Sequence, residues 1–344
     1  MGLGLPSTQV KRMKLLVTGG LGFIGSNFIR YMLSEHPDTE IVNLDKIGLG
    51  ANPENLKDME KIERYQFIKG DISNPQVIIG LVKKIDVLAN FAAETHVDRS
   101  IVDPAPFLRS NTLGTFTLLE AIRKFNENVK YIQISTDEIY GEILKGSFCE
   151  LDRLNPSNPY SATKASADML CLAYHRTYGL NVNITRCTNN FGPYQFPEKL
   201  IPKTIIRAAK DLPIPLYGTG RNVRDWIYVL DHCDAVSLVL SKGKLGEIYN
   251  ISSGDEVPNI KIVKEILDLL YKSEDLITFV EDRPGHDFRY SLDSSKIRSE
   301  LGWKPRYTFS SALKETVKWY VENESWWKPL STKKILHPTP WKIR

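Results

Sequence analysis

The chain has 344 residues, and 45 Lys and Arg residues against 41 Asp and Glu give it a formal net charge of +4. This length predicts two lobes around a large core. The near balance of charge gives no reason to expect nucleic acid or an acidic membrane as a partner, and no apolar run is long enough to span a membrane. The four cysteines include no C-x-x-C pair, so we interpret them as reduced thiols of a cytoplasmic protein.

A glycine-rich stretch near the N-terminus predicts a dinucleotide site. The segment GGLGFIGSNFIRYML follows a short apolar strand at 14–18 and reads as the start of an amphipathic helix. Its glycines fit two related spacings, G-x-G-x-x-G and G-x-x-G-x-x-G: Gly19, Gly20, Gly22 and Gly25. Such glycines let backbone amides approach a pyrophosphate at a helix N-terminus.

The next predicted strand, 40–44, ends at Asp45, which lies 20 residues after Gly25. At this distance a carboxylate meets the ribose hydroxyls of the dinucleotide and disfavours a phosphorylated ribose. The alternative is that Asp45 is a turn residue. The spacing and the strand end together favour NAD over NADP.

Strand and helix patterns continue to alternate along the chain. Predicted strands at 65–68 and 85–91 are followed by helical patterns at 104–126 and 161–178. This alternation predicts an α/β fold with a Rossmann-like, doubly wound parallel sheet.

Two adjacent acids follow another predicted strand, in the stretch YIQISTDEIYG. Tyr131–Ile134 alternates as a buried strand does, and Thr136, Asp137 and Glu138 come directly after it. Ligands of open parallel sheets bind at the carboxyl ends of strands, where two acids can act as proton donor and acceptor. The alternative is a strand-to-helix turn that Thr136 caps.

A Tyr-x-x-x-Lys pair lies at the start of the predicted helix at 161–178. Tyr160 and Lys164 are four residues apart, so they share one helical face. We expect the ammonium to lower the pKa of the phenol and make Tyr160 a usable base. Tyr65 and Lys69 have the same spacing, but in a predicted strand where they converge less well.

Together these motifs resemble the extended short-chain dehydrogenase/reductase family. TGGLGFIG is similar to its cofactor loop, and Tyr160 and Lys164 are similar to its catalytic pair. Within this family the chain most resembles the dTDP-glucose 4,6-dehydratases, over about residues 13–325. The matching segments occur in order: TGGLGFIGSNF, FAAETHVDRSI, STDEIYG, PYSATKASAD, NNFGPYQFPEKLIP, YGTGRNVRDWIYV and DRPGHDFRY.

The resemblance implies NAD as cofactor and a dTDP-hexose as substrate. The catalytic residues that it implies are Thr136, Asp137, Glu138, Tyr160 and Lys164. The implied cofactor contacts are Gly19, Gly22, Phe23, Ile24, Gly25, Asp45, Lys46, Asp71, Ile72, Ala92, Ala93, Tyr160, Lys164 and Asn190. The implied substrate contacts are Thr95, Thr136, Asn189, Lys199, Leu200, Pro215, Tyr217, Arg224, Asn259, Arg283 and His286.

Arginines in the second half suit a nucleotide-sugar ligand. Arg221, Arg224 and Arg283 carry guanidinium groups that can bind a diphosphate bidentately, and Arg224 is our first choice. We expect no metal. The run at 232–234, His-Cys-Asp, is interpreted as the start of a helix capped by Asp231.

We expect a discontinuous division into domains. Residues 13–188 and about 224–257 are predicted to form the NAD-binding Rossmann domain, and about 189–223 and 258–325 a smaller α/β substrate-binding domain. The leader, 1–12, and the tail, 326–344, receive no role.

The strands predicted at 226–229 and 247–251 are assigned to the nucleotide-binding sheet. The resemblance further implies a homodimer, paired through the helices near 104–125 and 161–178 as a four-helix bundle.

The expected reaction is an internal redox dehydration. Tyr160, assisted by Lys164 and Thr136, removes a hydroxyl proton while the hydride of carbon 4 passes to NAD. Glu138 then removes the carbon 5 proton, Asp137 protonates the departing 6-hydroxyl, and the hydride returns to carbon 6. The alternatives are a UDP-sugar 4,6-dehydratase, a nucleotide-sugar 4-epimerase and a non-catalytic NAD-binding scaffold.

Overall fold

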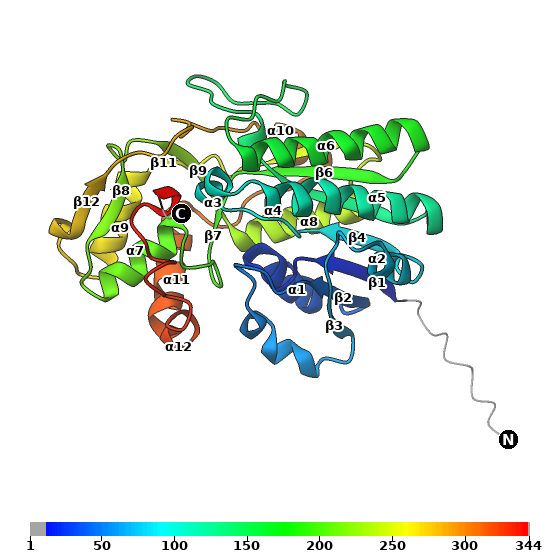
Figure 1. The fold of residues 1–344 in the computed structure, drawn as a ribbon, viewed down its shortest axis with the longest axis horizontal. Coiled ribbons are helices and arrows are strands. Elements are labelled where there is room, and N and C mark those ends of the chain that lie inside the picture. The colour runs from blue at the N-terminus through cyan, green and yellow to red at the C-terminus, as the bar shows by residue number, and fades with distance from the viewer. Residues whose placement is uncertain (1–11, 343–344) are drawn as a thin grey trace.

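The computed structural model describes residues 12–342, so the first eleven residues of the predicted leader lie outside the described part. Its larger lobe is built on a seven-stranded sheet in which all neighbouring strands are parallel (Figure 1). The order across the sheet is β10-β6-β5-β4-β1-β2-β3. The strands are β1 (Met13–Thr18), β2 (Thr39–Asp45), β3 (Tyr65–Lys69), β4 (Val87–Asn90), β5 (Lys130–Thr136), β6 (Val182–Cys187) and β10 (Ile248–Ile251). The predicted Rossmann-like fold is therefore confirmed.

Helices cover both faces of this sheet, and on each face an apolar core lies between the sheet and its helices. One face packs against α2 (Pro75–Val82), α5 (Gly114–Phe125) and α6 (Pro159–Tyr178). The other packs against α1 (Phe23–Glu35), α8 (Val229–Lys242) and α10 (Ser295–Leu301). Strands buried on both faces read as nearly continuous apolar runs, as Leu15–Val17 does.

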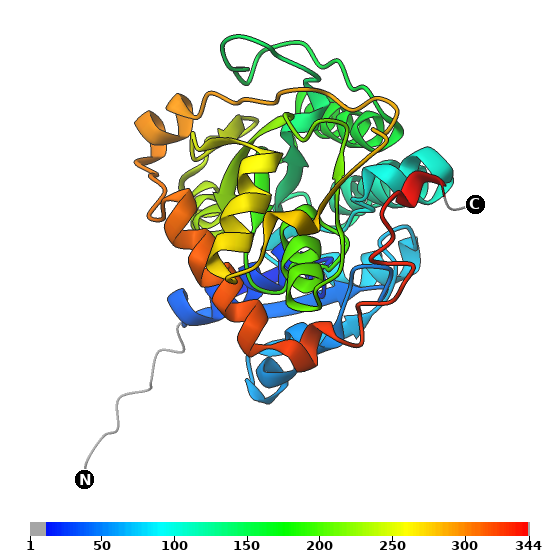
Figure 2. The same ribbon diagram turned by 90° about the vertical axis from the view of Figure 1, so that its left-hand side faces the viewer.

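A smaller lobe lies beside the carboxyl ends of the strands, and Figure 2 turns it toward the viewer. It holds a three-stranded sheet of β7 (Asn189–Phe191), β9 (Val223–Tyr228) and β11 (Glu256–Pro258), and a pair formed by β8 (Ile214–Tyr217) and β12 (Ile277–Val280). Its helices are α7 (Leu200–Ala209), α9 (Asn259–Leu269), α11 (Phe309–Glu322) and α12 (Glu324–Trp327). The strands and helices of this lobe pack around an aromatic-rich core that includes Phe191 and Trp226.

Two sequence predictions are wrong in this region. The strand predicted at 226–229 lies in the smaller lobe, where β9 pairs with β7 and β11, although α8 after it does pack on the large sheet. A buried apolar run gives no information on which sheet receives it. Asp231 does not cap α8 either: it lies in the first turn, and its carboxylate accepts the backbone N–H groups of Arg306 (2.9 Å) and Tyr307 (3.1 Å).

The helical pattern predicted at 104–126 is present, but it is interrupted. After α3 (Val97–Val102), the chain forms α4 (Ala105–Phe107), a π-helical turn η3 (Leu108–Leu113) and then α5. Short 3-10 turns complete the fold: η1 (Pro53–Asn55), η2 (Lys57–Lys61), η4 (Asp137–Ile139), η5 (Glu274–Leu276) and η6 (Pro340–Lys342). Within residues 12–342, no helix is both long and apolar enough to cross a membrane.

Candidate active site

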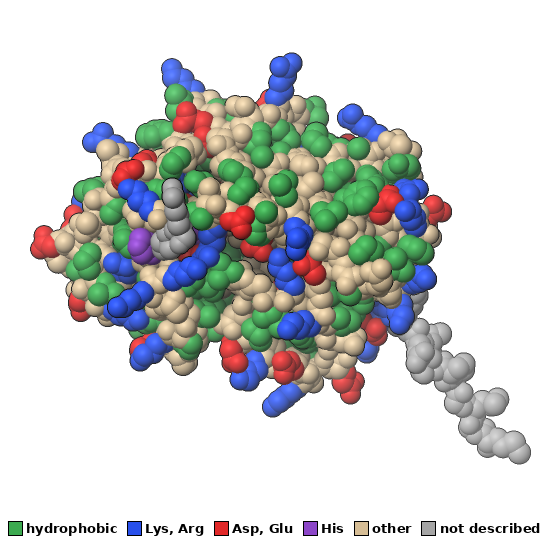
Figure 3. Space-filling model, in the orientation of Figure 1, with side chains coloured by type: hydrophobic (Ala, Val, Ile, Leu, Met, Phe, Trp, Pro, Cys, Tyr) green, Lys and Arg blue, Asp and Glu red, His purple; other side chains and the backbone are tan. Residues whose placement is uncertain are grey.

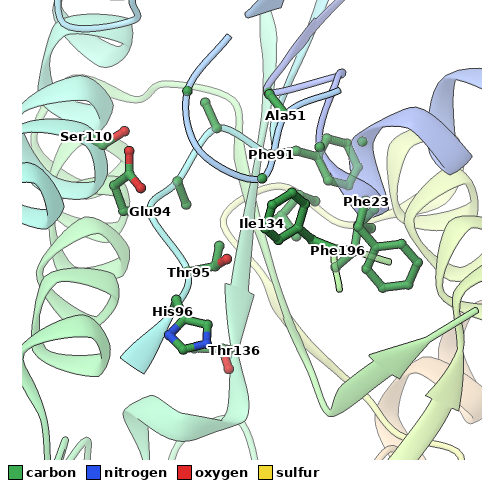
Figure 4. Close-up of a pocket in the computed structure, with 18 of the residues that line it drawn as sticks. Phe23, Ala51, Phe91, Glu94, Thr95, His96, Ser110, Ile134, Thr136 and Phe196 are labelled. Atoms are coloured by element: carbon green, nitrogen blue, oxygen red, sulfur yellow. The ribbon is translucent and has the colours of Figure 1, made fainter. Parts of the chain in front are cut away.

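A large cavity opens at the carboxyl ends of β1, β2, β4 and β5, where the strand order reverses between β1 and β4. In Figure 4, Phe23, Phe91 and Phe196 lie on one side of this cavity and Glu94 and Ser110 on the other. All the residues predicted to contact the cofactor line it: Gly19, Gly22, Phe23, Ile24, Gly25, Asp45, Lys46, Asp71, Ile72, Ala92, Ala93, Tyr160, Lys164 and Asn190. We call it the first cavity.

The glycine loop exposes its backbone to this cavity, because Gly19, Gly22 and Gly25 have no side chains to cover it. Gly19 has a φ of +70°, and a Cβ there would lie 2.6 Å from the backbone of Ala92. A Cβ on Gly25 would lie 2.4 Å from the carbonyl oxygen of Gly19. The N-cap of α1 is Gly22, which has no side chain to satisfy the first N–H groups, so those amides are free for an anionic ligand.

Asp45 is both a turn residue and a wall of the first cavity. One carboxylate oxygen accepts the N–H of Leu21 (3.0 Å) and the other that of Ile47 (2.8 Å). The residue thus ties the glycine loop to the end of β2. Burial raises the pKa of Asp45, while these two backbone hydrogen bonds oppose that rise.

Local capping places Tyr160 and Lys164. Asn158 and Ser161 form a reciprocal capping box, with the Asn158 side chain accepting the N–H of Ser161 (2.9 Å), so α6 begins immediately before Tyr160. Both side chains are buried and line the first cavity. The other pair of this spacing, Tyr65 and Lys69, lies on edge strand β3 and lines neither cavity.

The predicted effect of Lys164 on Tyr160 is wrong. Burial raises the pKa of Tyr160 well above its ordinary value, and the charge of Glu138 raises it further. The Lys164 Nζ instead donates to the carbonyl oxygen of Ile134 (2.6 Å), and burial lowers the pKa of Lys164. Sharing a helical face brings the two residues to one cavity, but the Lys164 ammonium is not among the main causes that shift the pKa of Tyr160.

The two acids occupy the turn η4 at the end of β5. Thr136 does cap this turn, since its hydroxyl accepts the N–H of Glu138 (3.3 Å). Burial raises the pKa of Asp137 to about 8, with Glu138 as the next cause. One oxygen of each carboxylate, Asp137 Oδ2 and Glu138 Oε2, is buried without a hydrogen-bond partner among the described residues. Such atoms are costly unless a ligand satisfies them. The turn interpretation is therefore confirmed, and the catalytic one stays a prediction.

A second cavity continues from the first into the smaller lobe. Glu138, Asn189 and Lys199 line both cavities, so the two meet beside the acids. The predicted substrate residues that line the second cavity are Asn189, Lys199, Leu200, Pro215, Tyr217, Arg224, Asn259, Arg283 and His286. Thr95 and Thr136 line the first cavity instead.

Four cationic side chains line the second cavity beside three carboxylates: Lys199, Lys203, Arg224 and Arg283, with Asp98, Glu138 and Glu198. Arg224 is buried and donates to the carbonyl oxygens of Val223 (2.7 Å) and Asp287 (2.8 Å), but no carboxylate of the described chain pairs with it. A buried cation without a counter-charge favours an anionic ligand. Arg221, by contrast, is exposed and lines neither cavity, so its candidacy for a diphosphate is wrong. Figure 3 shows Lys and Arg side chains on both sides of the hollow between the lobes.

Sequence reasoning missed two residues that organise these walls. Asp98 accepts hydrogen bonds from Tyr217 Oη (3.1 Å) and Arg283 Nη1 (2.9 Å), so α3 holds two side chains of the smaller lobe. The side chain of Asn111, in the π-helical turn η3, accepts the backbone N–H of Glu94 (2.8 Å). Its amide nitrogen donates to the backbone carbonyl oxygen of Glu94 (3.0 Å) and to the hydroxyl of Thr163 on α6 (2.9 Å). Asn111 lies in a polar run, 109–112, so no local sequence signal distinguished it from its neighbours.

Comparison with known proteins agrees with this geometry. Residues 16–316 match the family model described as GDP-mannose 4,6 dehydratase. The chain belongs to this family.

Named relatives of the GDP-mannose 4,6 dehydratase family narrow the comparison. The chain is 47% identical over 320 residues to a dTDP-glucose 4,6-dehydratase of Actinoplanes sp., covering 92% of this chain and 100% of that one. It is similar to the crystal structure of dTDP-glucose 4,6-dehydratase from Bacillus anthracis in complex with NAD (TM-score 0.88, 47% identity, 93% and 100% covered). It is also similar to DesIV, a dTDP-glucose 4,6-dehydratase from Streptomyces venezuelae with NAD and TYD bound (TM-score 0.91, 45% identity, 93% and 100% covered).

Proposed function

We propose that this chain is an NAD-dependent hydro-lyase that converts dTDP-glucose into dTDP-4-keto-6-deoxy-glucose and water. The observation that carries this proposal is the position of Asp137 and Glu138. They lie where the first cavity, which suits a dinucleotide, meets the second cavity, which is lined by buried cations such as Arg224. A plain oxidoreductase needs only the first cavity and Tyr160, whereas removing water needs an acid and a base beside the sugar.

The cofactor and the substrate residues support an extended ligand arrangement. NAD fits the first cavity through the glycine loop and Asp45, and when bound it supplies the acceptor and later the donor of the hydride. The hexose belongs beside Glu138, where the cavities meet. The diphosphate belongs against Arg224 and Arg283, because guanidinium groups bind phosphate oxygens bidentately.

The protein's own residues move the protons. Tyr160, with the Thr136 hydroxyl beside it, is placed to take the proton of the 4-hydroxyl as carbon 4 is oxidised. It must do so as the phenolate, a form that the positive charge of bound NAD would favour, while Lys164 lines the same cavity one helical turn further on. The new 4-keto group makes the carbon 5 proton acidic, and Glu138 removes it. Asp137 donates its proton to the departing 6-hydroxyl, so water leaves. Carbon 6 is then reduced and carbon 5 reprotonated.

The burial of Asp137 supports different roles for the two acids. With a pKa of about 8, Asp137 holds its proton at neutral pH, and burial is the main cause. A protonated carboxyl can donate, and so Asp137 is the acid; Glu138 is left as the base. Neighbouring carboxylates in a dry site resist being ionised together.

The pH dependence of elimination follows from this assignment. An acid must carry its proton to donate it, so the rate of water elimination should fall as the pH rises through about 8, where Asp137 ionises. The measurement is the single-turnover rate of keto-sugar formation against pH, with circular dichroism confirming the fold. An elimination rate that stays flat, or rises, above this pH contradicts the assignment of Asp137.

Three alternatives are separated by one assay. The chain is incubated with dTDP-glucose or UDP-glucose, alkali is added, and the ultraviolet absorbance of a keto sugar is recorded. We expect absorbance with dTDP-glucose and far less with UDP-glucose. A 4-epimerase would return an isomeric sugar without this absorbance, and a non-catalytic scaffold would leave both sugars unchanged.

We further propose that residues 13–188 with 224–257 act as the NAD-binding domain, and 189–223 with 258–325 as the substrate domain. β9, which lies in the smaller sheet, is the exception at this boundary.

We place the enzyme in the cytoplasm. Its four cysteines, Cys149, Cys171, Cys187 and Cys233, are free thiols, which suits a reducing compartment.

We also propose a homodimer in which α5 and α6 of two copies form a four-helix bundle. Exposed apolar side chains follow this surface, among them Leu113, Phe116 and Met169. Light scattering should give twice the chain mass for the wild type. Phe116→Glu with Met169→Glu should give one chain mass, because charge is costly in an apolar interface. The control Leu151→Glu, at a fully exposed position elsewhere, should stay dimeric. A wild type of single chain mass contradicts the dimer.

A further inference from the structure

The C-terminal segment 331–342, which we call the strap, is packed against the molecule rather than trailing from it. After α12 it runs past α7 and ends in η6 beside α3, as the red trace in Figures 1 and 2 shows. Ile335 and Leu336 are buried, and every residue from 335 to 341 is at least partly buried. The strap therefore belongs to the folded body.

The strap contacts three separate walls of the second cavity from outside. The carbonyl oxygen of His337 accepts a hydrogen bond from Lys203 on α7 (3.3 Å). The ring of Trp341 meets that of Tyr217 edge to face, with centroids 4.6 Å apart and planes at 80°. The turn η6 packs on α3, which carries Asp98. Lys203, Tyr217 and Asp98 all line the second cavity, whereas Trp341 does not.

These contacts also join the two lobes. α3 follows a strand of the large sheet, whereas α7, β8 and β12 belong to the smaller lobe. Lys342 forms an ion pair with Glu281, directly after β12, and Arg207 on α7 donates to the carbonyl oxygen of Leu336 (2.7 Å). The strap thus ties the cavity walls contributed by both lobes to one segment.

Tyr217 lines a part of the second cavity that does not border the first, and this part suits the nucleotide base of the substrate. The hexose end is marked by Glu138, Asn189 and Lys199, which border the first cavity. Tyr217 and Pro215, both on β8, line the second cavity but not the first, and they offer a flat apolar wall. Aromatic rings stack on nucleotide bases with substantial affinity.

We propose that Trp341 is a positioning residue that holds Tyr217 in place for the base of the substrate. This inference rests on the proposed function. Three contacts hold the Tyr217 side chain: its hydroxyl donates to Asp98 (3.1 Å), and its ring packs edge to face with Trp341 (centroids 4.6 Å apart) and, less closely, with His286 (6.3 Å). Without Trp341 the closer of the two ring contacts is lost, so the ring must be ordered further when substrate binds, which weakens binding rather than chemistry.

The test compares Trp341→Ala, Trp341→Leu and Trp341→Phe with the control Tyr271→Ala, which removes an aromatic ring that is 96% exposed and in none of the ring contacts described here. KM for dTDP-glucose, kcat, and the Kd of dTDP alone are measured for each. Trp341→Ala and Trp341→Leu should raise KM and Kd about two- to tenfold, the range that an aromatic pair contributes. Their kcat should stay near that of the wild type. Trp341→Phe should restore most of the affinity, and Tyr271→Ala should change nothing.

The outcomes separate this inference from the function on which it rests. Unchanged KM and Kd in Trp341→Ala or Trp341→Leu, or a lower kcat at constant KM, overturn the role of Trp341 while the wild type still turns over. A wild type that binds dTDP without converting dTDP-glucose overturns the proposed function, and the Kd series then decides the role of Trp341. A wild type that does not bind dTDP overturns both. Thermal melting identifies any variant that fails to fold, and the bulkier apolar replacement Trp341→Leu then decides.

Discussion

Replacing Tyr160 with Phe should stop the reaction at its first step. The substitution removes one hydroxyl from a buried position that lines the first cavity beside Glu138. Without that oxygen no group takes the 4-hydroxyl proton, and general base catalysis of this kind contributes about a hundredfold or more to the rate. Under single-turnover conditions, the near-ultraviolet absorbance of NADH should therefore fail to appear, and kcat should fall by the same factor.

The chain provides a matched control in its second Tyr-x-x-x-Lys pair. Tyr65→Phe also removes a phenolic hydroxyl, but from a strand outside both cavities, where it accepts a hydrogen bond from Asn43 (3.0 Å). Its activity should remain close to that of the wild type. NADH formation at the wild-type rate in Tyr160→Phe would show that another group is the base.

Replacing Asp137 with Asn, or Glu138 with Gln, should divide the reaction in two. Both replacements keep the shape of the turn η4, but an amide at the first position cannot act as a carboxylic acid, and an amide at the second cannot act as a carboxylate base. Oxidation at carbon 4 uses Tyr160 and should continue, so NADH absorbance should appear and persist. Water elimination should slow by about a hundredfold or more, measured as keto-deoxy sugar formed per turnover.

These two variants fail at a different step from Tyr160→Phe, and this difference is the informative result. Asp152→Asn, an exposed acid further along the same loop, serves as the control and should leave both steps intact. Binding of NAD should be unchanged in all of them. Full dehydratase activity in both Asp137→Asn and Glu138→Gln would refute the assignment of the acids.

Local sequence signals predicted most of the fold and the first cavity. The glycine loop, Asp45 and the Tyr160–Lys164 pair each combine a spacing with a secondary-structure context, and the structure brings all of them to one cavity. Parallel strands end at the same edge of a sheet, so predicting the strands was enough to gather these side chains.

Contacts between distant segments could not be predicted in this way. Asp98 acts by holding Tyr217 and Arg283, which lie 119 and 185 residues away. The effect of burial on the pKa of Tyr160 depends on the surrounding walls, and no helical spacing encodes it. Nor did the sequence of the tail indicate that Trp341 returns to Tyr217.

In the proposed reaction, one molecule of substrate donates and recovers the same hydride. dTDP-glucose carrying deuterium at carbon 4 tests this directly, with the product examined by nuclear magnetic resonance and mass spectrometry. We expect dTDP-4-keto-6-deoxy-glucose with the deuterium at carbon 6 of the same sugar. Product without deuterium at carbon 6, or deuterium left at carbon 4 of an isomerised sugar, would contradict it.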